Sequence, residues 1–264
     1  MINLHEPYLN LKDKSYLSRC LDSGWISNSG KYISRFENDI CKYLKIKFAL
    51  SFINCTSALQ IAILLINKNE KNEIIIPCIG FIAPANAILY NNCEPIFMDV
   101  DDHYTLDIQK TIEFLNNNTF KRFDRKTNKY FTYNKKTKKK IVCIIIMHVF
   151  GNAANISKLV AFCKKRNIKI IEDASESLGT KYLKSNLKNK FTGTVGEINA
   201  ISFNGNKIIT SGGGGIILTN SFKHYKKARY LINQAKDNSI NYIHNDIGYN
   251  YRLSNLQAAI GLAQ

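Results

Sequence analysis

Short apolar runs alternate with amphipathic stretches along most of the chain. The apolar runs are typical of β-strands and the amphipathic stretches of α-helices. Several runs, such as 141–147, are apolar at every position, which is typical of parallel strands covered by helices on both faces. The predicted strands are 48–53, 74–76, 95–100, 141–147, 168–172, 198–203 and 215–219. The pattern therefore predicts an α/β fold with an open, mostly parallel seven-stranded sheet flanked by helices.

Apolar residues that recur at helical spacing predict the intervening helices. In the stretch 156–166, for example, Leu159, Phe162 and Cys163 share one helix face. The predicted helices are 56–66, 82–90, 107–115, 156–166 and 222–235. The polar stretch 116–140 shows neither period and is predicted to be a surface loop.

The last segment of the chain also follows a helical pattern. The sequence LSNLQAAIGLAQ (253–264) predicts an apolar helix, and Ser254 is its expected N-cap. The pattern stops without a C-cap glycine or a basic last turn. A domain rarely ends in the middle of an apolar helix, so we expect an incomplete chain.

The composition is typical of a folded intracellular protein. Apolar residues make up 45% of the chain, and no apolar run approaches the roughly 20 residues that span a bilayer. The first ten residues lack the layout of a secretory signal. The seven cysteines include no C-x-x-C pair and the five histidines show no zinc-ligand spacing, so reduced thiols and no metal site are expected. A cytoplasmic protein without a membrane partner is therefore predicted.

The net charge is strongly positive. The chain has 37 Lys and Arg against 20 Asp and Glu, a formal charge of +17, and its densest basic run is 135–140. Such a charge can attract nucleic acid, a membrane surface or a small anion. No nucleic-acid-binding signature accompanies it, so a nucleic-acid partner is not expected. A solvated loop or attraction of an anionic substrate accounts for the charge.

Polar residues follow three of the predicted strands, where open α/β sheets bind their ligands. After 48–53, the segment NCTS (54–57) opens a helix whose N-terminal N–H groups and hydroxyls suit a phosphate. Ordinary N-capping by Thr56 or Ser57 is the alternative. Asp173 and Glu176 follow 168–172, where helix capping is again the alternative for the acid.

Lys207 follows the strand predicted at 198–203, and a lysine near apolar residues can form a Schiff base. The glycine run 212–215 is not a Walker phosphate loop and is expected to form a tight turn. Pyridoxal phosphate (PLP) requires a lysine for its aldehyde, an acid for its ring nitrogen, an anion site and a flat apolar surface. The order phosphate cup, aromatic, strand-end Asp173 and Ser-x-x-x-x-Lys predicts such a site.

The chain resembles the DegT-type nucleotide-sugar aminotransferases, a fold-type I PLP family. The joint run SFNGNKIITSGGGG (202–215) with the later GYNYR (248–252) is highly specific, and the resemblance is weakest in 116–140. Other matching segments are GWISNSG, NCTSALQIAIL, PCIGFIAPANAILY, PIFMDVD, MHVFGN and EDASESLG. The chain is most similar to the legionaminic acid and N-acetylbacillosamine branch. The resemblance implies transfer of an amino group, with glutamate as the usual donor, to C4 of a nucleotide-linked 4-keto-6-deoxy-N-acetylhexosamine.

The resemblance also implies roles for single residues. Lys207 matches the Schiff-base lysine, and Asp173 matches the acid that pairs with the pyridinium nitrogen. Glu176 matches a position, often Gln, that contacts the PLP 3-hydroxyl. Phe81 matches the aromatic residue that stacks on the ring, with core packing as the alternative.

Further residues match the phosphate and sugar sites of the family. Thr56, with the backbone at Cys55 and Ser57, matches the phosphate cup, and Ser202 matches a further phosphate ligand. Asn250 matches an asparagine that reaches the phosphate of the neighbouring subunit, which implies a homodimer with shared active sites. The residues in segments that border the sugar pocket are Trp25, Ser27 and His148.

Family members continue past GLAQ into a smaller C-terminal domain, which this chain is expected to lack. The resemblance thus implies that 1–250 form the PLP-binding large domain with an N-terminal arm, and that 251–264 begin the helix that leads to the missing domain. A truncated, catalytically incompetent remnant of such an enzyme is therefore an alternative. Lys207 argues against the family's dehydratase branch, in which histidine replaces this lysine.

Overall fold

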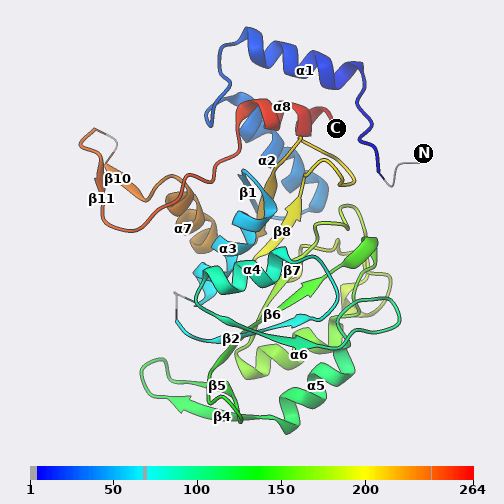
Figure 1. The fold of residues 1–264 in the computed structure, drawn as a ribbon, viewed down its shortest axis with the longest axis vertical. Helices are drawn as coiled ribbons and strands as arrows, with labels where there is room; N and C mark the ends of the chain where they lie inside the picture. The colour runs from blue at the N-terminus through cyan, green and yellow to red at the C-terminus, as the bar shows by residue number, and fades with distance from the viewer. Residues whose placement is uncertain (1–4, 68–69, 239) are drawn as a thin grey trace.

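A seven-stranded sheet lies at the centre of the molecule, with helices on both faces (Figure 1). The computed structural model describes residues 5–67, 70–238 and 240–264. The strand order is β1-β9-β8-β7-β6-β2-β3. The strands are β1 (Phe48–Phe52), β2 (Glu73–Pro77), β3 (Glu94–Met98), β6 (Ile141–Met147), β7 (Lys169–Asp173), β8 (Asn199–Ser202) and β9 (Gly215–Thr219). All seven predicted strands are confirmed.

The sheet is mostly parallel, as predicted. β3, β2, β6, β7 and β8 pair in parallel, whereas β9 is antiparallel to both of its neighbours, β1 and β8. The inner strand β6 is buried at every position. β7 lies beside β6, and β8 lies beside β7. β7 and β8 end at Asp173 and Ser202, so the carboxyl ends of adjacent strands bring predicted site residues to one edge.

Two layers of helices cover the sheet. The α-helices are α1 (Leu11–Asp22), α2 (Lys31–Leu44), α3 (Cys55–Asn67), α4 (Ala83–Tyr90), α5 (Ile108–Asn117), α6 (Ser157–Arg166), α7 (Phe222–Ile232) and α8 (Asn255–Ala263), with short 3-10 helices η1 (Val149–Gly151) and η2 (Ser185–Leu187). α3, α4 and α7 share one apolar core with the sheet, and α5 and α6 share another. A third core lies under α2 and α8. The five helices predicted before the last segment are confirmed, although α7 ends at Ile232 rather than at 235.

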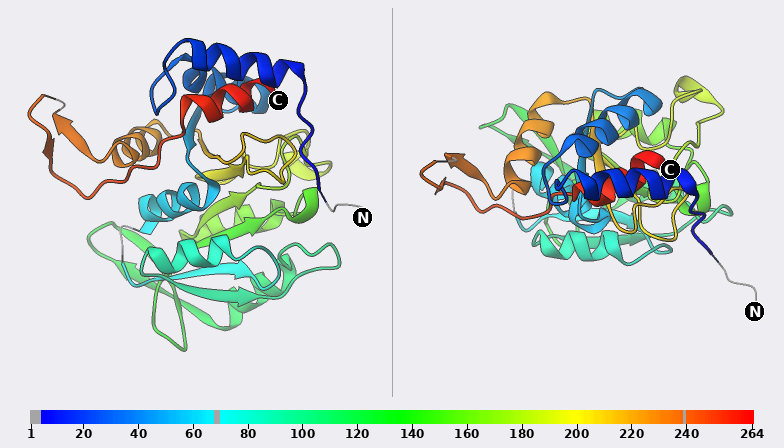
Figure 2. Two further views of the ribbon diagram at one scale, coloured as in Figure 1. Left: turned by 45° about the horizontal axis from the view of Figure 1, so that its top comes forward. Right: turned by 90° about the horizontal axis from the view of Figure 1, so that it is seen from above.

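The two N-terminal helices α1 and α2 are additional to the predicted ones. α2 buries Tyr32, Phe36, Ile40 and Leu44 at four-residue spacing, an amphipathic signal that is visible in the sequence. α1 gives a weaker signal, because Asp13 and Cys20 are its buried residues while Leu11 is 82% exposed. α1 packs beside α8 (Figures 1 and 2).

Asn255 joins the N-terminal region to the start of α8. Its side-chain Oδ1 accepts the N–H of Tyr32 at 3.0 Å, and its Nδ2 donates to the carbonyl of Trp25 at 2.6 Å. Its backbone N–H donates to the carbonyl of Ser27 at 2.6 Å. The predicted cap is confirmed, because Ser254 Oγ accepts the N–H of Gln257 at 3.2 Å.

The prediction of a surface loop over 116–140 is wrong. β4 (Thr119–Asp124) and β5 (Lys129–Asn134) form an antiparallel hairpin, at the opposite end of the molecule from α1 (Figure 1). Aromatic residues stack across the strands, with the Phe120 and Tyr133 ring centroids 5.7 Å apart. Charged residues interleave with these rings and conceal the strand period in the sequence.

A second hairpin projects from the body of the molecule (Figures 1 and 2). It pairs β10 (Lys236–Asn238) with β11 (Ile243–His244). Near it, Ile240 is 85% and Ile247 79% exposed. Across the described residues, no helix has the length and apolar character that a membrane crossing requires.

Candidate active site

A cavity of about 620 Å³ opens at the carboxyl ends of β6, β7 and β8, beside the N-terminus of α3. Its volume lies within the range of small-molecule sites. It brings together eight of the predicted residues, namely Cys55, Thr56, Phe81, His148, Asp173, Glu176, Ser202 and Lys207. Residues that lie up to 152 positions apart in the sequence therefore meet at one sheet edge.

The N-terminus of α3 forms one end of the cavity. Asn54 caps this helix, because its Oδ1 accepts the N–H of Ser57 at 2.9 Å, so the alternative of a cap at Thr56 or Ser57 is wrong. The Ser57 hydroxyl donates to the carbonyl of Asn54 at 2.9 Å, and Ser57 does not line the cavity. Thr56 does line it. A helix N-terminus with a neighbouring hydroxyl favours an anion.

A glycine at the start of β9 permits this arrangement. A Cβ atom on Gly215 would lie 2.5 Å from the backbone nitrogen of Cys55. The strand therefore approaches the first turn of α3 too closely for any side chain. The preceding glycines turn the chain into the strand, and Gly212 has a φ of +77°. The predicted tight turn is confirmed.

Asp173 is the buried acid of the cavity, and 7% of it is exposed. Its Oδ1 accepts the backbone N–H of Ser175 at 3.1 Å and also the Ser175 hydroxyl. Burial raises the pKa of the Asp173 carboxyl, while the bonds from Ser175 and the charge of Lys207 oppose the rise. A carboxylate in this setting gains stability from a cationic group beside it.

Lys207 and Glu176 form an ion pair inside the cavity. Nζ of Lys207 lies 3.4 Å from Oε1 of Glu176, and the Lys207 side chain is 14% exposed. The other oxygen, Oε2, accepts the backbone N–H of Phe150 at 2.8 Å. Phe150 has a φ of +53°, an uncommon value for a residue with a side chain. Glu176 therefore ties the lysine to η1.

Two exposed aromatic residues line the same cavity. Phe81 is 73% exposed and Phe150 is 79% exposed. The alternative that Phe81 packs in the core is therefore wrong. An exposed ring on a cavity wall is suited to stack on a flat ligand.

The structure places the remaining predicted residues away from the cavity lining. Trp25 is 62% exposed, and its carbonyl is held by Asn255, as is the carbonyl of Ser27. Asn250 is exposed and lies on the segment that leads from the β10–β11 hairpin to α8. The roles of these residues in a sugar pocket or a shared site stay predictions.

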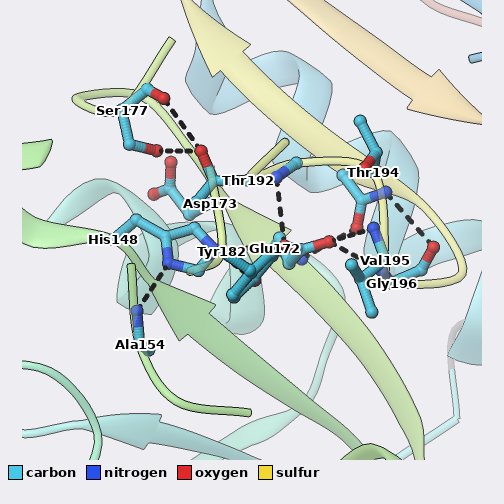
Figure 3. Close-up of polar contacts among 12 residues, drawn as sticks. His148, Ala154, Glu172, Asp173, Ser177, Tyr182, Thr192, Thr194, Val195 and Gly196 are labelled. Carbon is cyan, nitrogen blue, oxygen red and sulfur yellow. Dashed lines mark hydrogen bonds and ion pairs between the residues drawn. The ribbon is translucent and has the colours of Figure 1, made fainter. Parts of the chain in front are cut away.

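The sequence did not indicate the contacts behind the cavity wall (Figure 3). His148 is 1% exposed, and its Nε2 lies 3.1 Å from Oε1 of Glu172, which is fully buried. Ser175 is a second such residue, since its hydroxyl contacts both Asp173 and the thiol of Cys55. The run EDASES shows that polar residues follow a buried strand, but it does not show which side chains meet.

Comparisons with known proteins identify relatives of this chain. The family model described as the DegT/DnrJ/EryC1/StrS aminotransferase family matches residues 7–264. The GDP-perosamine synthase of Escherichia coli O157:H7 is 36% identical over 264 residues, which is all of this chain and 65% of that protein. EpsN of Bacillus subtilis, named as a pyridoxal phosphate-dependent aminotransferase, is 33% identical over 100% of this chain and 63% of its own length.

A solved structure shows the same architecture. PseC of Helicobacter pylori, an aminotransferase involved in the biosynthesis of pseudoaminic acid, superposes with a TM-score of 0.83 at 27% identity. The match covers 99% of this chain and 64% of PseC. The chain thus spans just under two thirds of the length of these relatives. With the family model matched over 7–264, the chain belongs to the DegT/DnrJ/EryC1/StrS aminotransferase family.

Proposed function

We propose that this chain forms the cofactor-binding part of a PLP-dependent aminotransferase that acts on nucleotide-linked sugars. The observation that carries the proposal is the meeting of Lys207, Asp173 and Phe81 in one cavity at the N-terminus of α3. Family membership supports it, as do the names of EpsN and the GDP-perosamine synthase.

The residues of the cavity fit PLP. Lys207 offers an amine to the aldehyde, and Asp173 offers a buried carboxylate to the ring nitrogen. Phe81 offers a ring for stacking, while Thr56 and Ser202, with the N-terminus of α3, would hold the phosphate. When bound, PLP supplies an electron sink for amino transfer.

With the cofactor bound, three side chains of the cavity would have separate roles. Asp173 would stabilise a protonated ring nitrogen, because burial disfavours its charged form and a nearby cation offsets this cost. Lys207 Nζ would move the proton between the substrate carbon and C4′ of the cofactor. Glu176 would orient Lys207 and the 3-hydroxyl side of the ring, since it contacts Lys207 in the cavity.

For the substrates, we propose L-glutamate as the donor and C4 of a nucleotide-linked 4-keto-6-deoxy-N-acetylhexosamine as the acceptor. The resemblance to the legionaminic acid and N-acetylbacillosamine branch supports this choice. The names of PseC and the GDP-perosamine synthase support an amino-sugar product. The +17 charge of the chain favours an anionic nucleotide sugar.

We also propose that a second copy of the chain completes the site. Asn250 lies outside the cavity of its own chain and is exposed. It follows the projecting hairpin, where Ile240, Tyr242 and Ile247 expose apolar side chains that a partner subunit would cover.

Absorption spectroscopy tests the cofactor site. The purified chain should develop a visible band with PLP that L-glutamate bleaches, and Lys207→Ala should lack this band. The chain should then aminate a UDP- or GDP-linked 4-keto-6-deoxy sugar, and the comparison of the two identifies the nucleotide. A chain that forms no lysine-dependent band refutes the proposal, and a band without amino transfer favours the incompetent remnant.

Subunit mixing tests the shared site. Lys207→Ala and Asn250→Ala should each be defective, but a mixed dimer regains one site with Lys207 from one chain and Asn250 from the other. Mixing should therefore restore part of the PLP band. No restoration from dimers that do exchange subunits would contradict a shared site.

A further inference from the structure

Glu172 carries a fully buried carboxylate directly before Asp173, and the proposed chemistry does not use it. Its Oε1 accepts the hydroxyl of Tyr182 at 2.7 Å and the N–H of Gly193 at 3.0 Å, and lies 3.1 Å from Nε2 of His148 (Figure 3). These donors come from three separate segments of the chain. The carboxylate therefore holds together parts of the wall that are distant in sequence.

The second oxygen is equally well satisfied. Oε2 accepts the backbone N–H groups of Val195 and Gly196, each at 2.6 Å. Burial disfavours the charged form of the Glu172 carboxyl, but the hydrogen bonds that its two oxygens accept favour that form. Glu172 is thus an ionised group with five donors directed at it.

The contacts of His148 determine where its ring carries a proton. Nδ1 lies 3.2 Å from the backbone N–H of Ala154 and accepts from it, so Nδ1 has no proton of its own. Nε2 then carries the proton and donates it to Glu172. Tyr182 reinforces this choice, since its oxygen lies 3.3 Å from the same Nε2. The other neutral tautomer would turn an N–H toward the N–H of Ala154.

His148 also adjoins the acid of the cavity. Its backbone N–H donates to the carbonyl of Asp173 at 3.0 Å, and the residue forms part of the cavity wall with its side chain fully buried. A cationic imidazolium here would partly neutralise the charge of Asp173. A neutral ring leaves the negative charge of Asp173 free to attract a cationic group of the ligand.

We propose that Glu172 is a positioning residue of the cofactor site, which acts by fixing His148 as the neutral Nε2–H tautomer beside Asp173. It also holds the 193–196 segment against the wall. This inference rests on the proposed PLP site for its effect on the cofactor. The tautomer itself is a property of the protein without cofactor.

Nitrogen-15 NMR of the cofactor-free 264-residue chain at pH 7.5 tests the tautomer directly. The His148 signals are identified by their loss in His148→Gln. We expect a protonated Nε2 and an unprotonated Nδ1 at this residue. An Nδ1–H tautomer or an imidazolium in the wild-type chain would overturn the proposal, whatever the chain does with PLP.

Two variants separate positioning from general packing. Glu172→Gln removes the charge and turns an amide N–H₂ toward existing donors, so it should disturb the tautomer signals and weaken PLP binding about tenfold. Tyr182→Phe removes one neutral donor to the same carboxylate, so it should keep the tautomer and change the PLP affinity by less than about threefold.

The outcomes are distinct. A folded Glu172→Gln chain that keeps both the tautomer and the wild-type PLP affinity refutes the proposal. If Glu172→Gln does not fold, the wild-type spectrum and Tyr182→Phe decide, and a lost tautomer in Tyr182→Phe counts against Glu172 as its determinant. A wild-type chain with the expected tautomer but no PLP binding refutes the proposed function and leaves the tautomer assignment standing.

Discussion

Nζ of Lys207 lies 3.4 Å from Oε1 of Glu176, so a carboxylate holds the Lys207 amine inside the cavity. The same side chain accepts the N–H of Phe150, which has an uncommon backbone conformation. Glu176 therefore sets both the direction of the lysine and the shape of the adjoining η1 segment. Its two oxygens serve two different donors.

Because one Glu176 oxygen contacts Lys207 and the other accepts the N–H of Phe150, two substitutions at Glu176 should have different effects. Glu176→Gln keeps an acceptor for the Phe150 N–H and should change the PLP affinity by less than about threefold. Glu176→Ala leaves that N–H without its partner and should weaken PLP binding about tenfold. Titration of the visible PLP band measures both. Equal affinities in the two variants would show that Glu176 does not organise the site.

Asp173→Asn should stabilise the cofactor-free chain at neutral and alkaline pH. Because the folded pKa of this carboxyl is raised above its ordinary value of 3.8, the folded state holds the proton more tightly than the unfolded state. The wild type therefore loses stability as the pH rises from that value through the raised pKa. The variant, which cannot ionise, should gain relative stability over that range and keep it above.

Urea unfolding of both chains between pH 4 and pH 8 measures this difference. The bonds from Ser175 to Oδ1 can persist in the variant, so its fold should be unchanged. Saturating PLP should raise the Tm of the wild type more than that of Asp173→Asn, since ligand binding stabilises the folded state. A variant less stable than the wild type at pH 8 would show that Asp173 is needed for folding.

The sequence was sufficient to predict the sheet and much of the cavity for one physical reason. Buried parallel strands are continuous apolar runs, and polar residues directly after them must lie at one edge. Lys207, Asp173 and Thr56 were found in this way and do share a cavity. The five donors around Glu172 were not predictable, because they are brought together by the tertiary fold.

The errors have equally specific causes. In the 116–140 region, cross-strand pairs such as Phe120 with Tyr133 stabilise the hairpin. The lysines between these aromatic residues obscure the strand period in the sequence. In α1, the exposed Leu11 and the buried Asp13 reverse the usual rule for an amphipathic helix. Asp13 can be buried because the side chain of Gln264 donates a hydrogen bond to it at 3.0 Å.

Asn255→Ala should destabilise the chain by about 2–4 kcal/mol. Its buried amide satisfies Tyr32 on one side and Trp25 on the other, and an alanine would leave both backbone groups without these partners. Ser254→Ala is the matched control at the preceding position. It removes the N-cap of α8 and should cost about 1 kcal/mol.

Thermal or urea unfolding at pH 7.5 compares the two variants. We expect Asn255→Ala to lower the Tm by roughly 5–10 °C and Ser254→Ala by roughly 2–4 °C. Equal losses would mean that Asn255 contributes only as a residue of the first turn of α8, rather than as the link to the 24–32 segment.

Shortening the β4–β5 hairpin should leave the cofactor site intact. The hairpin is anchored at the amino end of the sheet, where Nδ2 of Asn134 donates to Oε2 of Glu73 at 3.0 Å, and Glu73 is the first residue of β2. The cavity lies at the opposite, carboxyl edge. Replacing residues 122–131 by Asn-Gly joins the paired residues Lys121 and Thr132 by a two-residue turn and keeps the anchor.

The replacement removes four basic residues together with the exposed end of the hairpin. Because the distal hairpin is far from the cavity, the PLP affinity should stay within about twofold of the wild-type value. The rate of capture of a nucleotide sugar should fall, and more so at low salt, if the basic hairpin contributes to the field that attracts the anion. A lowered PLP affinity in a chain of unchanged stability would instead mean that the hairpin is coupled to the cavity through β6. This strand follows the hairpin in the chain and ends at the cavity.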